Sequence, residues 1–153
     1  MEALLLMRIL GLDVGDRRIG VALSDSLGMT AQRLTVVTRQ RLAADIEAIA
    51  TLVRHHAVER IVIGLPLTLR GEQGPQAQKV VAFVEALRTQ ITVPLELVDE
   101  RFTTLQGERA LLEMNTSRKD RKQVIDQVAA QLILQQFLDQ HYQRSPDTDE
   151  GTT

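Results

Sequence analysis

The chain has 153 residues with a formal net charge of −2, and 44% of its residues are hydrophobic whereas 3% are aromatic. This length supports one compact domain and excludes two domains around a cleft. The absence of cysteine excludes disulfides, thiolate metal sites and cysteine nucleophiles, while the charge and the few aromatic residues argue against an indiscriminate nucleic-acid coat and a base-stacking surface.

Hydrophobic patterning predicts a mixed α/β domain. Its first half contains two strands joined by a short hairpin at Gly15–Arg17, then a third strand, a helix and a continuously apolar fourth strand. Its second half begins with a helix opened by Gly74-Pro75. A fifth strand, a short helix with the capping box Thr103-x-x-Gln106, a basic loop SRKDRK and a long final helix follow. The expected bounds are 8–14, 18–24, 34–38, 60–65 and 95–100 for the strands, 103–114 for the short helix and 123–142 for the last helix.

The composition also predicts the domain boundary and the cellular compartment. Residues 145–153 are acidic and lack core-forming side chains, so we expect a domain of residues 1–144 followed by a disordered acidic tail. No apolar run approaches the roughly 20 residues of a membrane span, and no secretory segment is recognisable. We therefore expect a cytoplasmic protein with no membrane partner.

Three carboxylates lie at positions where ordinary folding does not require them. Asp13 and Glu100 end the first and fifth strands, although a turn aspartate and a solvated strand-end acid are the simpler alternatives. Asp126 shares a helical face with Ala130 and Ile133, the face expected to lie on the sheet. A carboxylate there costs several kcal/mol unless a positive group compensates it, or unless the dipole of the first helical turns stabilises it.

The donor chemistry of these acids indicates a hard cation. Three carboxylates without cysteine suit Mg²⁺ or Mn²⁺ rather than zinc. The three histidines, His55, His56 and His141, are expected at helix ends, where they interact with the helix dipole rather than with a metal.

Basic residues beside such a site would bind phosphates. For residues 118–122, a solvated charged loop is the alternative. Acids flanked by cations indicate phosphodiester chemistry. The candidate nucleic-acid-binding residues are Arg17, Arg18, Arg101, Arg118, Lys119, Arg121 and Lys122.

Four ordered segments resemble the YqgF/RuvX family of ribonuclease H-like proteins, known as pre-16S rRNA nucleases or Holliday junction resolvase-like proteins. They are DVGDRRIGVALSD, GLPLTLRGEQGPQA, VDERFTT and IDQVAAQLILQQFL, and the resemblance covers residues 7 to about 142. It implies a ribonuclease H-like α/β fold, a mixed five-stranded sheet whose first three strands are antiparallel, with helices on both faces. It also implies that Asp13, Glu100 and Asp126 are the metal-binding catalytic acids.

The resemblance implies an endonuclease that uses Mg²⁺ or Mn²⁺ to hydrolyse phosphodiester bonds at the 5′ end of pre-16S ribosomal RNA. In a two-metal scheme, Asp13 would bridge ions about 3.5–4 Å apart, and Glu100 and Asp126 would each complete one site. Ala129 and Ala130 stand where related resolvases and ribonucleases H carry a fourth acid or a histidine. We therefore expect one of two metals to be weakly held.

Three other functions remain open from the sequence. The Asp-x-Gly hairpin is similar to that of actin-like ATPases, which need two domains around a nucleotide. A Holliday junction resolvase acting on branched DNA would need a two-fold dimer. We expect a monomer instead, because the apolar stripes cover the sheet while Gln131, Gln135 and Asp139 occupy the other side of the last helix. The third alternative is a non-catalytic nucleic-acid-binding or ribosome-assembly factor.

Overall fold

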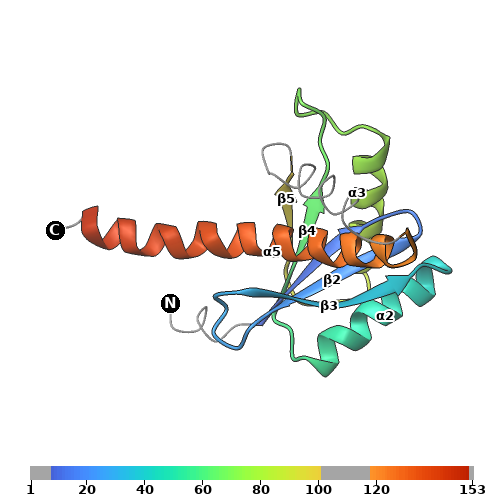
Figure 1. Cartoon of the computed structure of the whole chain (residues 1–153), viewed down its shortest axis with the longest axis horizontal. Coiled ribbons are helices and arrows are strands. Elements are labelled where there is room, and N and C mark those ends of the chain that lie inside the picture. Colours follow the sequence, from blue (N-terminus) through green and yellow to red (C-terminus); the bar gives the residue numbers. More distant parts are fainter. Residues whose placement is uncertain (1–7, 101–117, 152–153) are drawn as a thin grey trace.

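Five strands form one mixed sheet in the spatial order β3-β2-β1-β4-β5 in the computed structural model, which describes residues 8–100 and 118–151 (Figure 1). The first three strands are antiparallel neighbours, whereas β1, β4 and β5 run parallel to one another. The strands are β1 (Ile9–Val14), β2 (Arg18–Ser24), β3 (Ala31–Thr38), β4 (Arg60–Leu65) and β5 (Leu95–Asp99). The helices are α2 (Leu42–His55), α3 (Pro75–Arg88) and α5 (Arg118–Gly151). The expected sheet is therefore confirmed, and β3 begins at Ala31 rather than at Leu34.

The helices cover both faces of this sheet, as expected (Figure 1). Side chains alternate along each strand, so Leu10, Leu12 and Val14 of β1 pack against α2 and α3. Ile9 lies in a second cluster, beneath α5. The α5 side of that cluster consists of Ala129, Ala130, Ile133, Leu134, Phe137 and Leu138. The buried face predicted for the last helix is therefore confirmed.

Glycines on three neighbouring strands let α5 lie unusually close to the sheet. We call Gly11 of β1, Gly20 of β2 and Gly64 of β4 the glycine track. A Cβ atom built on Gly11 would lie 2.8 Å from Cβ of Leu134, and one built on Gly20 would overlap the backbone carbonyl of Asp126. Real Cβ atoms do not approach other atoms this closely. The glycine track therefore fixes the height of α5 above the sheet.

The last helix is longer than expected at both ends. It begins at Arg118, so the basic loop expected over residues 117–122 and the helix start expected at Gln123 are wrong. Lysine and arginine are good helix formers, and the sequence Ser117-x-x-Asp120 is a helix-start signal that the high charge obscured. Helical backbone continues to Gly151, which differs from the disordered tail expected over 145–153. Backbone hydrogen bonds of a helix are internal, so a lack of apolar side chains does not end it.

Two polar side chains of α5 fasten the edge strand β3 instead of facing away from the sheet. The side-chain amide of Gln131 donates to the carbonyl of Ala31 at 2.9 Å, and Oε1 of Gln135 accepts from the amide of Ala31 at 2.9 Å. The expectation that both glutamines lie on the outer side is therefore wrong. Helical periodicity gives the direction of a side chain but not which strand lies below it.

The histidines lie where helices end, with one exception. His55 is the last residue of α2, and His56 follows it as the C-cap. Burial, together with the nearby His55 and Arg8, lowers the pKa of His56. His141 lies inside α5 rather than at its end, and its ring centroid is 4.1 Å from that of Phe137.

The short helix expected over 103–114 lies outside the described residues. None of the helices in the described part of the chain combines the length and the hydrophobicity that a bilayer crossing requires.

We predict that Gly20→Ala lowers the free energy of unfolding by about 3 kcal/mol, the upper end of overpacking costs, because its methyl group meets helix backbone rather than a side chain that can rotate. Gly74→Ala is the matched control, because the nearest atom to its Cβ would be Cγ2 of Thr68 at 3.5 Å. That control should cost about 1 kcal/mol or less. Equal urea-denaturation midpoints for the two variants would contradict the packing account.

Candidate active site

Asp13 lies on the α5 side of β1, near the carboxyl end of the strand. It alternates with Leu12, which packs on the opposite side, and its antiparallel partner in β2 is Gly20. The parallel register of β1 and β4 pairs Leu12 with Ile63, so the next position sets Gly64 beside Asp13. Asp13 is thus flanked by a glycine on each neighbouring strand.

The other two predicted acids occupy the space that these glycines leave open. A Cβ atom built on Gly64 would lie 2.7 Å from Oε1 of Glu100. The backbone amide of Glu100 donates to the last residue of β4 at 3.1 Å, which extends the pairing of β5 beyond its end. On the other side, the backbone of Asp126 lies directly over Gly20. The structure therefore places Asp13 between Glu100 and Asp126, on one face of the sheet.

Asp126 has a positive partner in β2. Nε of Arg18 donates to Oδ2 of Asp126 at 2.7 Å, and the side chains keep 27% and 20% of their exposure, respectively. The dipole explanation for this acid does not apply, because α5 begins at Arg118 and the dipole acts mainly within the first turn. The compensating charge that burial of Asp126 requires is therefore Arg18.

The carboxylates of Asp13, Glu100 and Asp126 are suitable ligands for a divalent cation, but the described side chains do not converge on one metal position. Carboxylate oxygens are the ligands that Mg²⁺ and Mn²⁺ prefer, and the glycine at position 64 leaves room for Glu100 beside Asp13. Within residues 8–100 and 118–151, however, no three His, Cys, Asp or Glu side chains converge as a ready metal cluster. One reason is visible at Asp126, whose carboxylate is turned to Arg18.

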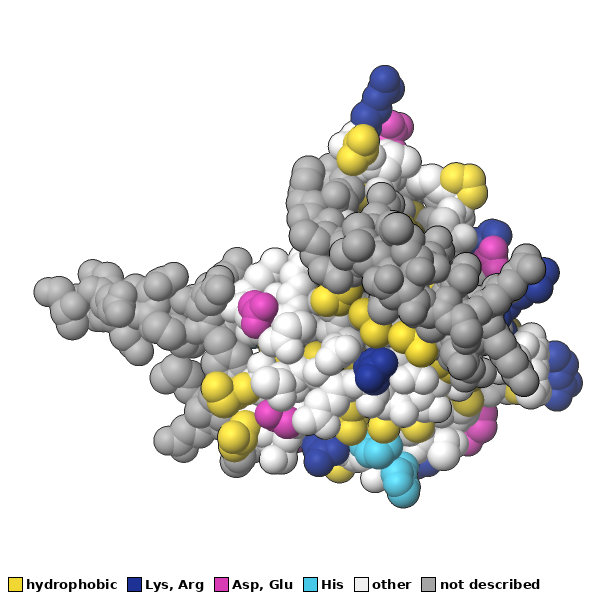
Figure 2. All heavy atoms as spheres, in the orientation of Figure 1, with side chains coloured by type: hydrophobic (Ala, Val, Ile, Leu, Met, Phe, Trp, Pro, Cys, Tyr) yellow, Lys and Arg dark blue, Asp and Glu magenta, His cyan; other side chains and the backbone are white. Residues whose placement is uncertain are grey.

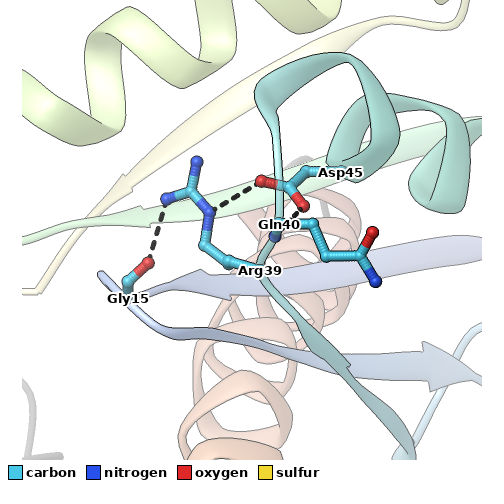
Figure 3. Close-up of polar contacts among 4 residues, drawn as sticks. All are labelled: Gly15, Arg39, Gln40 and Asp45. Atoms are coloured by element: carbon cyan, nitrogen blue, oxygen red, sulfur yellow. Dashed lines mark hydrogen bonds and ion pairs between the residues drawn. The ribbon is translucent and has the colours of Figure 1, made fainter.

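An ion pair between a half-buried arginine and a buried aspartate holds the β1–β2 turn from the opposite face of the sheet (Figure 3). Arg39, just after β3, donates from Nε to Oδ2 of Asp45 at 3.1 Å and from Nη1 to the carbonyl of Gly15 at 3.0 Å. Oδ1 of Asp45 accepts from the amide of Gln40 at 2.8 Å. The guanidinium also lies 5.0 Å from the ring centroid of Phe83 in α3. We call Arg39 and Asp45 the turn clamp.

Further contacts from α3 reach the same turn. Lys79 forms an ion pair with Asp16 at 3.2 Å, and the side-chain amide of Gln76 donates to the carbonyl of Val14 at 3.4 Å. The backbone amide of Arg39 donates to the carbonyl of Arg17 at 2.8 Å. The turn between Asp13 and Arg18 is therefore held by α3 and by Arg39, so neither side chain lies on an unsupported loop.

The turn clamp was missed in the sequence analysis, although a signal for it exists. Asp45 lies four residues before Ile49, and both are buried. An acid on the apolar stripe of a helix is the same pattern that singled out Asp126. The partner was harder to find, because Arg39 lies outside any predicted element.

Two of the seven predicted basic residues can be placed with their side chains. Arg17 is exposed in the β1–β2 turn, and Arg18 is half-buried at the start of β2. On the face in Figure 2, the described Lys and Arg side chains are scattered rather than gathered in one patch. Arg101 lies outside the described residues, and so do the side chains of Arg118, Lys119, Arg121 and Lys122, whose backbone forms the start of α5.

A family model described as "RuvX: Holliday junction resolvase" matches residues 7–140. The chain belongs to the RuvX family. This assignment confirms the resemblance found in the sequence, and it places the chain among nucleases rather than actin-like ATPases.

Named relatives agree with this family. A protein of Moorella thermoacetica named "Putative pre-16S rRNA nuclease" is 54% identical over 87% of this chain and 95% of its own length. One of Myxococcus xanthus with the same name is 50% identical over 94% of this chain and 93% of its own length. Thermus thermophilus RuvC, solved in complex with a Holliday junction substrate, has a TM-score of 0.53 at 14% identity and covers 83% of this chain and 91% of its own. That likeness confirms the ribonuclease H-like fold.

We predict that Arg39→Met lowers the free energy of unfolding by about 3 kcal/mol, because it leaves the carboxylate of Asp45 buried without its charge partner. Arg54→Met is the control, since it removes an exposed ion pair with Glu47 and should cost less than about 1 kcal/mol. Adding Asp45→Leu to Arg39→Met should recover part of the loss, because no charge is then buried. Urea denaturation measures all three, and similar losses for Arg39→Met and Arg54→Met would contradict the clamp.

Proposed function

We propose that this member of the RuvX family is an endonuclease that uses Mg²⁺ or Mn²⁺ to hydrolyse precursor 16S ribosomal RNA in the cytoplasm. The observation that carries the proposal is the position of Asp13 in the sheet. Its two neighbours are glycines, and the space above them is taken by Glu100 on one side and by Asp126 on the other. A structural role does not explain three acids around one strand position.

The three acids have distinct parts in the proposed chemistry. Asp13 lies at the centre and would be shared between metal sites, while Glu100 and Asp126 would each complete the coordination from one side. When bound, the metal lowers the pKa of a water molecule and stabilises the charge on the leaving oxygen. Arg17 and Arg18, on the turn beside Asp13, would bind the phosphates that flank the scissile bond.

The names of the relatives favour RNA over a four-way junction as the substrate. The surfaces of α5 favour it as well, because they already pack on the sheet and are not left for a dimer interface. A resolvase must cut two symmetry-related strands, which requires a two-fold dimer. The apolar face of α5 is buried on the sheet, and two of its glutamines bind β3. We therefore propose a monomer that cuts one strand. The family description and the likeness to RuvC make junction cleavage the second candidate.

We predict that Asp13→Asn, Glu100→Gln and Asp126→Asn each abolish Mn²⁺-dependent cleavage of a pre-16S RNA fragment. Combining the variants should add little, because residues that act as one unit are not additive. Asp139→Asn is the control, since this exposed acid of α5 contacts Gln135 and lies away from Asp13 along the helix. Thermal unfolding should show that the variants remain folded. Retained Mn²⁺-dependent activity in Asp126→Asn would contradict the assignment.

The substrate is tested by giving the wild-type protein the RNA fragment and a four-way DNA junction, each with Mn²⁺ or with EDTA. We expect metal-dependent cleavage of the RNA, little cleavage of the junction and a monomer in sedimentation. Paired symmetric nicks in the junction by a tight dimer would establish the resolvase instead. Binding of RNA without cleavage in any metal would establish a non-catalytic assembly factor.

A further inference from the structure

The carboxylate of Asp126 is engaged by Arg18, although the proposed function requires it at a metal. The contact is short, 2.7 Å from Nε to Oδ2, and it joins two elements that are more than one hundred residues apart in the chain. In the described part of the chain, Nε is the sole guanidinium nitrogen of Arg18 that donates to a protein acceptor. Among the described residues no acceptor occupies the two terminal amino groups of Arg18, which leaves them for another acceptor, and its side chain is 27% exposed.

This arrangement makes Arg18 and a metal ion competitors for one carboxylate. A guanidinium on Asp126 lowers the affinity of a cation there, because it shares the negative charge and repels the second positive charge. Arg18 also has the planar, forked donor geometry that binds a phosphate through two parallel hydrogen bonds. Arg18 could therefore bind either of two anionic oxygens, the carboxylate of Asp126 in the protein or a phosphate of the substrate.

The backbone around Arg18 is rigid enough for such an exchange to involve the side chain alone. Arg18 is the first residue of β2, and its carbonyl accepts from the amide of Gly15 at 2.9 Å. The turn clamp binds the same turn through the carbonyl of Gly15. Asp126 is fixed by the glycine track, because its backbone lies directly on Gly20. The competition is therefore decided by the two side chains, not by movement of β2 or α5.

We propose that Arg18 is a positioning residue that couples nucleic-acid binding to metal binding. In the free protein it holds the carboxylate of Asp126 away from the metal site. A phosphate of the nucleic acid takes over the guanidinium, and Asp126 is released to complete the site. The inference rests on the proposed function. By linkage, metal binding must strengthen phosphate binding by the same factor.

The test is a set of Mn²⁺ dissociation constants, measured from the electron paramagnetic resonance signal of free Mn²⁺. Wild-type protein, Arg18→Gln and Arg17→Gln are each titrated alone and with a short single-stranded RNA whose phosphorothioate linkages resist hydrolysis. Arg17→Gln is the control for charge, because it removes the same charge from the adjacent, exposed position. Since Arg17 is itself a proposed phosphate ligand, RNA is added at a saturating concentration for each variant. Thermal unfolding checks that both variants are folded.

Without RNA, Arg18→Gln should tighten Mn²⁺ binding by about three- to tenfold, the range for a half-buried charge-assisted hydrogen bond. Arg17→Gln should change it by less than about twofold, as expected for an exposed, screened charge. RNA should tighten Mn²⁺ binding in the wild type and in Arg17→Gln, and the tightening should be smaller in Arg18→Gln. Equal effects of the two arginine variants would overturn the proposal, because the charge alone would then explain them.

Two further results separate this inference from the proposed function. Weaker Mn²⁺ binding in Arg18→Gln would overturn the competition and show that Arg18 directs Asp126 to the metal, while the metal site itself would stand. Absence of Mn²⁺ binding in the wild type, or binding unchanged by Asp13→Asn, would overturn both. A check without variants is the Arg18 Nε–H resonance, which should shift when RNA is added without metal; an unchanged resonance would overturn the exchange.

Discussion

The close approach of α5 to the glycine track is the constraint on which the rest of the structure depends. Side chains normally separate a helix from the sheet beneath it, but at Gly11, Gly20 and Gly64 helix side chains or backbone occupy the place of the missing Cβ atoms. The missing side chain of Gly64 leaves room for Glu100 beside Asp13. The missing side chain of Gly20, the β2 partner of Asp13, lets the backbone of Asp126 lie directly above that strand. Packing of the fold and assembly of the site therefore follow from the same three residues. Ala129 and Ala130 belong to this contact, because both are buried where α5 meets the sheet.

Asp45 and Asp126 each form an ion pair with an arginine, and the burial of the two acids differs in a way that fits their roles. Asp45 is almost completely buried, and its partner Arg39 also binds the turn that precedes Arg18. Breaking such a pair leaves a buried charge, which suits a permanent support. Asp126 keeps 20% of its exposure against 2% for Asp45, although Arg18 and Arg39 are similarly exposed, at 27% and 21%. The carboxylate of Asp126 is therefore accessible to water, which suits an acid whose partner is exchanged.

The sequence predicts elements and faces well, because both follow from periodicity. The bounds of β2 and β4 agree with the alternating run Ile19, Val21, Leu23 and with the continuous apolar run 60–65. The buried face of α5 was predicted from the spacing of Asp126, Ala130 and Ile133; both apolar residues are buried against the sheet, and the backbone of Asp126 lies on Gly20. The strand of Asp13 and the helix of Asp126 were therefore available from the chain alone, and so was the strand before Glu100, although it ends at Asp99 rather than at residue 100.

Contacts between elements could not be predicted, since periodicity does not say which strand lies under which part of a helix. The partner of Asp126, the attachment of Gln131 to β3 and the turn clamp all depend on that register. The start of α5 was missed for a different reason. Charge was taken as a sign of a loop, although arginine and lysine favour helices.

The most direct test of the account is a crystal structure of the protein with Mn²⁺ and RNA, recorded at a wavelength where manganese scatters anomalously. The account predicts an anomalous peak about 2.0–2.3 Å from carboxylate oxygens of Asp13, with Glu100 and Asp126 completing the coordination and Arg18 turned to a phosphate. Manganese bound elsewhere, with Asp126 still held by Arg18, would contradict it.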